Sequence, residues 1–318
     1  MASRDVVLKC GLSGFRQLGP SAADGCPMLD LSVPNAHYGE PFHKAPGLTA
    51  TDCIALAPHL RNATALRKLR IRGLSGIHHT HEQPGIRSAG MQAIAAALPP
   101  NLEVLDISGN EIGNEGTQSL ATAFAARPAR NLRELNLALN SITDEGAVAL
   151  EGIFRVLPAL EKVTLDHNWI GAAGGEALAR ALHDGVTVRQ LSMASNNLAE
   201  RGGVALANAL GANRNLQALN LYSNSLGTRG AVAFAAMLAR GTSALADINL
   251  SHNYIDADGE STGAMALSDA IMRNNPTLRK LDLRWNHFAL CHCGSPARLR
   301  RAARGASRLE LVMERREA

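Results

Sequence analysis

Histidine and cysteine, which bind transition metals more often than most side chains, gather at two places in the sequence. The first cluster consists of His78, His79, His81 and Glu82. The second consists of Cys291, His292 and Cys293, with His287 nearby. A structural zinc site usually takes two ligand pairs from separate segments, and neither cluster has a second pair at such a spacing. We therefore expect a solvated loop around the first cluster, a packing role for the second, and no bound metal.

The sequence contains none of the common catalytic motifs. It has no glycine-rich phosphate loop, no GxSxG nucleophile elbow and no HExxH metal-binding pair. Asp106 and Asp282 are separated by several predicted strands, so they cannot act together as a general acid and base. We expect no enzymatic activity and no cofactor.

Aromatic and basic side chains lie around a recurring asparagine. The candidate partner-binding residues are His167, Trp169, Tyr222, His252, Tyr254, Arg284, Trp285 and His287. The chain has two Trp and three Tyr, and four of these five residues belong to this set. Exposed Trp and Tyr side chains often anchor protein interfaces, so we expect a protein partner here. Partial burial of the rings against an adjacent loop is the alternative.

These residues are positioned by a repeat of apolar residues and asparagine. One copy consists of Leu102, Leu105, Ile107, Asn110 and Ile112. Copies begin at Leu66, Leu102, Leu132, Leu160, Val188, Leu216, Leu245 and Leu278. From Leu132 to Leu245 the interval is 28 or 29 residues. The alternation at Leu105 and Ile107 predicts a strand. The later spacing of Gly146, Leu150 and Phe154 predicts a helix.

This string, with its period of 28 to 29 residues, resembles the leucine-rich-repeat family and its ribonuclease-inhibitor-like class over about residues 26–314. The resemblance implies an α/β solenoid shaped as a horseshoe, with parallel strands on the concave face and helices on the convex face. Each repeat buries its apolar faces only against its neighbours, so stacking provides stability. The expected organisation is one domain, 1–318: a cap and degenerate repeat (1–65), regular repeats (66–290) and a capping helix and strand (291–318).

The asparagines form a column at the ends of the predicted strands. Its members are Asn110, Asn140, Asn168, Asn196, Asn224, Asn253 and Asn286. Backbone groups at such a bend lose their strand partners, and an amide side chain can both donate and accept hydrogen bonds there. We interpret the column as structural. In the helix of the last repeat, we expect Leu299 and Ala303 to face inward.

Two other features are candidate binding surfaces. The middle strand positions are polar: Asp30, Arg70, Asp106, Asn136, Thr164, Ser192, Asn220, Asn249 and Asp282. We interpret their charges as those of a solvated strand face, with a binding footprint as the alternative. Insertions at 38–44, 75–85 and 256–260 enlarge loops, which in repeat proteins often lie on the binding face.

Composition narrows the class of partner and the compartment. The net charge of +4 is spread along the chain, and aromatic residues make up only 3% of it, which argues against nucleic-acid binding. Five irregularly spaced cysteines favour a reducing compartment. No apolar run is long enough to span a membrane. We expect a cytoplasmic protein, either a monomer or a subunit of a hetero-complex; an organellar or ciliary assembly stays open.

The leading hypothesis is a scaffold that binds a partner through the concave face and the strand-end loops. One alternative is a regulator of a small GTPase, because the repeat type is similar to that of Ran GTPase-activating proteins. Those proteins typically carry an acidic C-terminal segment, whereas this chain ends in 313–318 without one. A ribonuclease inhibitor, which would present an acidic and cysteine-rich surface, ranks lower. A structural subunit or sensing domain of a larger assembly is a further alternative.

Overall fold

A computed structural model describes residues 27–32, 48–73, 85–273, 275–288, 295–306 and 308–313. The chain divides into two compact units. Unit 1 comprises Met1–Ile142 and Gly152–Asn168, and unit 2 comprises Thr143–Glu151 and Trp169–Ala318. None of the helices in the described ranges is both long and apolar enough to cross a membrane.

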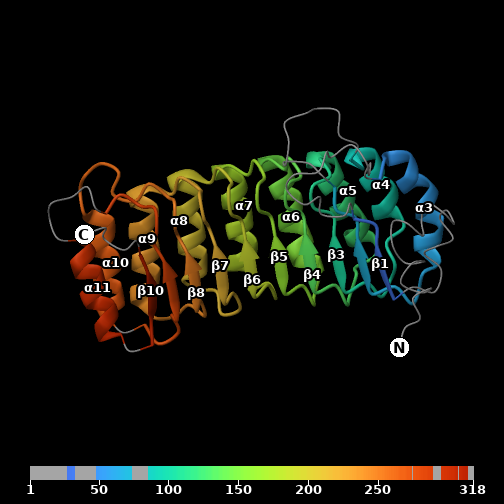
Figure 1. Ribbon diagram of the computed structural model, residues 1–318. Coiled ribbons are helices and arrows are strands. Elements are labelled where there is room, and N and C mark those ends of the chain that lie inside the picture. Colours follow the sequence, from blue (N-terminus) through green and yellow to red (C-terminus); the bar gives the residue numbers. More distant parts are fainter. Residues whose placement is uncertain are drawn as a thin grey trace, which may run out of the picture. The chain divides into compact units, whose positions relative to one another are not determined.

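Strands and helices alternate along both units (Figure 1). Unit 1 contains β1 (Met28–Asp30), α3 (Ala50–Asn62), β2 (Lys68–Arg70), α4 (Arg87–Ala96), β3 (Val104–Asp106), α5 (Gly113–Ala126), β4 (Glu134–Asn136) and β5 (Lys162–Thr164). The boundary between the units falls within α6 (Asp144–Val156). Unit 2 continues with α7 (Ala172–His183), β6 (Gln190–Ser192), α8 (Ala199–Leu210), β7 (Ala218–Asn220), α9 (Gly227–Arg240), β8 (Asp247–Asn249), α10 (Thr262–Met272), β9 (Lys280–Asp282), α11 (Ser295–Gly305) and β10 (Glu310–Val312).

Neighbouring strands within each unit are parallel and paired in register. In unit 1 the central residues align as Leu29, Leu69, Leu105, Leu135 and Val163. In unit 2 they align as Leu191, Leu219, Ile248, Leu281 and Leu311. All of these side chains except Leu311 are buried. This arrangement confirms the predicted α/β repeat of parallel strands and helices.

The helices bury apolar residues that recur at helical spacing. Leu150 and Phe154 of α6 are buried, as are Phe234 and Leu238 of α9. Figure 1 shows α7, α8, α9 and α10 stacked side by side in unit 2. The stacking explains the burial, because each helix covers the apolar stripe of the next.

The prediction for the last helix is wrong at one position. Leu299 of α11 is buried as expected, but the second buried residue is Ala302, and Ala303 is only half-buried. Residues three and four positions after Leu299 lie on either side of the same helix face. The spacing alone therefore did not determine which of the two faces the core.

The asparagine column holds the strand-to-loop bends, as predicted. In unit 1, Asn140 Oδ1 accepts hydrogen bonds from the backbone N–H groups of Asn110 (3.1 Å) and Ile112 (3.4 Å). Asn140 Nδ2 donates to the carbonyl groups of Ile107 (2.9 Å) and Ala138 (3.1 Å). The side chain therefore fixes the loop of the preceding repeat as well as its own loop.

Asn253 makes the same set of bonds in unit 2. Its Oδ1 accepts from the N–H groups of Asn224 (2.9 Å) and Leu226 (3.2 Å). Its Nδ2 donates to the carbonyl groups of Leu221 (2.8 Å) and Ser251 (3.0 Å). The series is interrupted at Asn224, whose buried Oδ1 has no hydrogen-bond partner among the described residues.

Two aspartates cap helices. Asp144, at the start of α6, accepts hydrogen bonds from the N–H groups of Gly171 (2.6 Å) and Gly174 (2.8 Å) where α7 begins. A Cβ atom at Gly174 would lie 2.7 Å from Asp144 Oδ1, so glycine keeps this capping contact open. Asp256 is fully buried and accepts from the N–H groups of Gly263 and Ala264, at 2.8 and 2.9 Å. Asp256 therefore belongs to the scaffold and not to an exposed loop surface.

Candidate functional site

Five rings from three successive repeats of unit 2 meet beyond the ends of the strands. We call Tyr222, His252, Tyr254, Trp285 and His287 the aromatic cluster. Tyr222 lies 5.6 Å from His252 and 6.1 Å from Trp285, between ring centroids. Tyr254 lies 6.1 Å from His252 and stacks on His287 at 5.7 Å. The rings form one connected chain of contacts, which the sequence alone could not establish.

The aromatic cluster combines exposed and half-buried rings. Trp285 is 52% exposed and Tyr254 is 51% exposed. Tyr222, His252 and His287 are half-buried and support them. Edge-on and stacked ring pairs of this kind are each worth about 0.5–1.5 kcal/mol beyond their burial. Two large apolar side chains are thus held in fixed positions while half of their surface stays in contact with solvent.

The backbone orients the rings. His252, Tyr254 and Trp285 have positive φ angles of 58°, 58° and 54°. Bulky side chains seldom adopt this left-handed region, and the asparagine hydrogen bonds on both sides hold the loop in it. The backbone N–H of His252 also donates to the carbonyl of Arg284 at 2.9 Å. The cluster is therefore rigid because of main-chain geometry as well as ring contacts.

Arg284 is tied into the scaffold beside the cluster. Its Nε and Nη2 atoms donate to the carboxylate of Asp282, with the shortest distance at 2.6 Å. The hydrogen bonds and the charge of this buried carboxylate raise the pKa of Arg284. Its guanidinium also lies over the Trp285 ring, 5.1 Å from the centroid. Arg284 acts mainly as a support for Trp285, a role that the sequence did not predict.

His287 carries a buried nitrogen. Its Nδ1 atom has no hydrogen-bond partner among the described residues, although the backbone N–H of His287 donates to the Ile255 carbonyl at 2.9 Å. The imidazole ring stacks on the ring of Tyr254. His287 thus contributes to the cluster through its ring face and not through a side-chain hydrogen bond.

Two of the predicted partner-binding residues lie apart from these contacts. Trp169 is 71% exposed, and none of the rings in the described ranges lies in contact with it. His167 belongs to unit 1. The ring contacts therefore join the repeats that carry Tyr222, Tyr254 and Trp285, and a binding role for His167 and Trp169 stays a prediction.

The polar row along the middle of the strands is less solvated than expected. Asp106 and Asp282 are buried, and Asp106 pairs with Arg72 at 2.6 Å. In both repeats the aspartate also accepts the backbone N–H two residues later, from Ser108 at 3.2 Å and from Arg284 at 3.1 Å. Asn136, Asn220 and Asn249 accept the same kind of bond. These side chains close turns at the strand ends, which favours a structural role for much of the row.

The remaining candidates for chemistry divide into two groups. His78, His79, His81, Glu82, Cys291, His292 and Cys293 lie outside the described residues. Within the described ranges, no group of three or more His, Cys, Asp or Glu is arranged to hold a metal ion. Cys53 is buried in α3, and this burial, with the nearby charge of Asp52, raises the pKa of its thiol to about 12. The thiol is therefore protonated at neutral pH and is not an activated nucleophile.

Comparison with known proteins supports a repeat architecture. A family model described as Leucine Rich repeat matches residues 99–121, 129–150, 157–179, 212–235 and 274–289. A search of curated proteins found no match. Together with the alternating strands and helices, the matches support a leucine-rich-repeat protein with an α/β repeat fold. Such repeats are generally protein–protein interaction modules without enzymatic activity.

Proposed function

We propose that this protein binds another protein through the aromatic cluster of unit 2. The observation that carries the proposal is the state of Tyr254 and Trp285, which are half-exposed yet held by ring contacts to Tyr222, His252 and His287. Large aromatic side chains that are already ordered lose little conformational entropy on binding. They are also the side chains most enriched among residues that dominate interface energetics.

The surroundings of the cluster support an apolar contact more than a charged one. The nearest cation, Arg284, is already paired with Asp282. Ser223, which follows Tyr222 and is half-buried, is small and uncharged. The partner is therefore expected to place apolar side chains against Tyr254 and Trp285. The proposed contact with the partner does not involve an unpaired arginine or lysine. The affinity for the partner should therefore change little with salt concentration.

The test compares two variants of the full chain in quantitative capture from a native extract, followed by affinity measurement with the purified partner. Tyr254→Ala combined with Trp285→Ala should weaken binding by at least about 30-fold, the effect expected for dominant interface residues. The double variant should stay folded, with a loss of about 1.5–4.5 kcal/mol from the three missing ring contacts.

Trp169→Ala is the matched control, because it removes an exposed tryptophan of unit 2 that is outside the cluster. The proposal is wrong if both variants retain the same partners, or if Trp169→Ala weakens binding as strongly as the double change. A small GTPase among the proteins lost only with the double variant would select the regulator hypothesis and justify a GTP-hydrolysis assay. Components of one structural complex would select the subunit hypothesis.

A further inference from the structure

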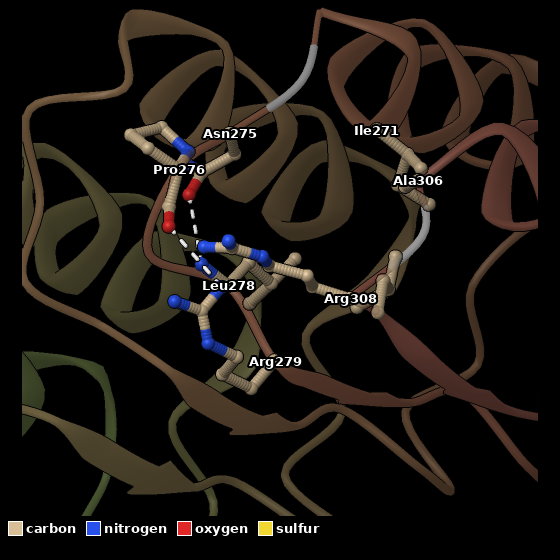
Figure 2. A pocket seen from close by; sticks show the side chains of 8 residues that line it. Ile271, Asn275, Pro276, Leu278, Arg279, Ala306 and Arg308 are labelled. Carbon is tan, nitrogen blue, oxygen red and sulfur yellow. Dashed lines mark hydrogen bonds between the residues drawn. The ribbon is translucent and has the colours of Figure 1, made fainter.

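A separate pocket lies at the opposite ends of the strands in unit 2, between the turn before β9 and the turn before β10. Its volume is about 230 Å³. The lining residues are Ile271, Asn275, Pro276, Leu278, Arg279, Ala306, Arg308 and Leu309 (Figure 2). None of these belongs to the aromatic cluster, so the pocket is independent of the proposed function.

The pocket has an apolar wall and two arginines. Ile271 and Leu278 are almost completely buried beneath it, and Leu309 is half-buried. Figure 2 shows the side chains of Arg279 and Arg308 among the lining residues, coming from the segments before β9 and β10. Both arginines are exposed. An occupant would therefore meet apolar surface on one side and positive charge on the other.

Neither arginine is neutralised by the protein. Within the described ranges, Arg279 and Arg308 form no ion pair with a carboxylate. Arg279 donates one hydrogen bond, from Nη1 to the Pro276 carbonyl at 3.2 Å. Arg308 has no side-chain hydrogen bond to any residue that the structure describes. Most of the ten donors on the two guanidinium groups thus stay available to a ligand.

The equivalent pocket of unit 1 shows that this arrangement is not a general property of the repeat. It lies between the turns before β3 and β4, has a volume of about 80 Å³ and is lined by one arginine, Arg127. Arg127 Nη2 donates to the Ala96 carbonyl at 3.1 Å. The pocket of unit 2 is larger, carries a second arginine and leaves one guanidinium without a protein partner.

We propose that the unit 2 pocket binds a phosphate monoester carried on a single aromatic ring or a group of similar size. Arginine recognises phosphate through paired, charge-assisted hydrogen bonds, and two arginines match the charge of about −1.5 to −2 on a monoester at pH 7. A cavity of about 150 Å³ accepts one benzene ring, so this pocket has room for a ring and part of the phosphate. Ile271, Leu278 and Leu309 would contact the ring.

The experiment titrates the full chain with phenyl phosphate, inorganic phosphate and phenol, with binding followed by calorimetry and by amide chemical shifts. Phenyl phosphate should bind more tightly than either fragment, because only it uses both the apolar wall and the arginines. Arg308→Gln should weaken its binding by about ten-fold or more, as expected for the loss of hydrogen bonds to a charged group. Arg301→Gln, which removes an exposed arginine of α11 outside the pocket, should change binding less than about two-fold.

Three results would overturn the proposal: no binding of phenyl phosphate at millimolar concentration, equal binding of inorganic phosphate, or equal losses in Arg308→Gln and Arg301→Gln. A phosphotyrosine peptide, with its unphosphorylated form as control, distinguishes the sources of the ligand. Binding of the phosphopeptide that Arg308→Gln weakens supports the pocket with a protein-borne ligand. Binding of phenyl phosphate without the peptide supports the pocket with a free small molecule.

Discussion

At the strand ends, the two units have the same backbone conformation but carry different side chains. The residue before the column asparagine has a positive φ angle in both, 73° at Gly109 and 58° at Leu139 in unit 1, and 58° at His252 and 54° at Trp285 in unit 2. The residue after it is Glu111 or Ser141 in unit 1 but Tyr254 or His287 in unit 2. The bends at Asn110 and Asn140 therefore form without aromatic residues at these positions, as does the bend at Asn224 between Ser223 and Ser225. The aromatic residues around Asn253 and Asn286 require another explanation.

The comparison distinguishes the asparagine positions, which are the same in both units, from the neighbouring positions, where the side chain varies. Asn140 and Asn253 make matching sets of four hydrogen bonds in the two units. The side chains next to them lie on the surface and are not needed for those bonds. Side chains at such free positions can be selected for binding without loss of these hydrogen bonds, which is the reason why the aromatic cluster is the candidate interface.

The largest expected effect tests whether the scaffold is the same in both units. Asn140→Ala and Asn253→Ala should each lower the free energy of unfolding by about 2–4 kcal/mol, because each leaves buried backbone groups without partners. Urea denaturation measures this, with the exposed Asn197→Ala as a control that should change stability by less than about 0.5 kcal/mol. A large loss in one unit and none in the other would show that the two bends are built differently.

A smaller effect concerns the loop after the cluster, where unit 2 has Asp256 and unit 1 has Gly113 at the same distance from the asparagine. Burial, partly offset by the hydrogen bonds from Ala264 and Gly263, raises the pKa of Asp256 above 3.8. The folded state then binds this proton more tightly than the unfolded state, so protonation stabilises the fold. That stabilisation is complete below pH 3.8 and is lost as the pH rises through the folded pKa.

The measurement is the unfolding free energy of the wild type minus that of Asp256→Asn, from acidic to neutral pH. The difference should fall as the pH rises through this window. Asparagine keeps one acceptor oxygen and cannot titrate. The hydrogen bond that it loses therefore changes the free-energy difference by the same amount at every pH. A difference that grows with pH would show that the hydrogen bonds to Ala264 and Gly263 outweigh burial.

The smallest expected effect places an aromatic residue of unit 2 into unit 1. Ser141→Tyr puts a tyrosine at the position equivalent to Tyr254, where Ser141 is exposed and has a φ of 57°. Its free energy of unfolding should change by less than about 0.5 kcal/mol, as for other exposed positions. Thermal denaturation checks this. A loss above 1.5 kcal/mol would mean that tyrosine is tolerated in unit 2 only because its neighbours support it.

The sequence predicted most of the scaffold because one rule repeats. Apolar residues at fixed spacing predicted the strand around Leu105 and the helix that buries Leu150 and Phe154. The spacing did not determine which residue within a helix face is buried, because in α11 the buried residue is Ala302 and not Ala303. The caps and the boundaries at 1–65, 66–290 and 291–318, the single domain and the cytoplasmic location stay predictions.

The candidate site was only partly predictable, since its contacts join different repeats. The repeat pattern placed Tyr222, Tyr254 and Trp285 at strand ends, but ring contacts depend on side-chain direction, so the sequence did not show that these rings touch. The sequence did not predict that Arg284 pairs with Asp282. It showed only that both residues are charged, among neighbours of mixed character. The pocket between two turns, with Arg279 and Arg308, depends on residues nearly 30 positions apart that serve no repeated role.

The hydrogen bonds of the column asparagines are asymmetric along the chain. Asn140 supplies an acceptor for the loop of Asn110, and Asn253 supplies one for the loop of Asn224, so each of these two bends is completed by the repeat that follows it. During synthesis on a ribosome, a repeat would emerge with these N–H groups still bound to water until its successor left the exit tunnel. Folding should therefore lag one repeat behind elongation, and removing a repeat from the C-terminal side should leave more unpaired backbone than removing one from the N-terminal side.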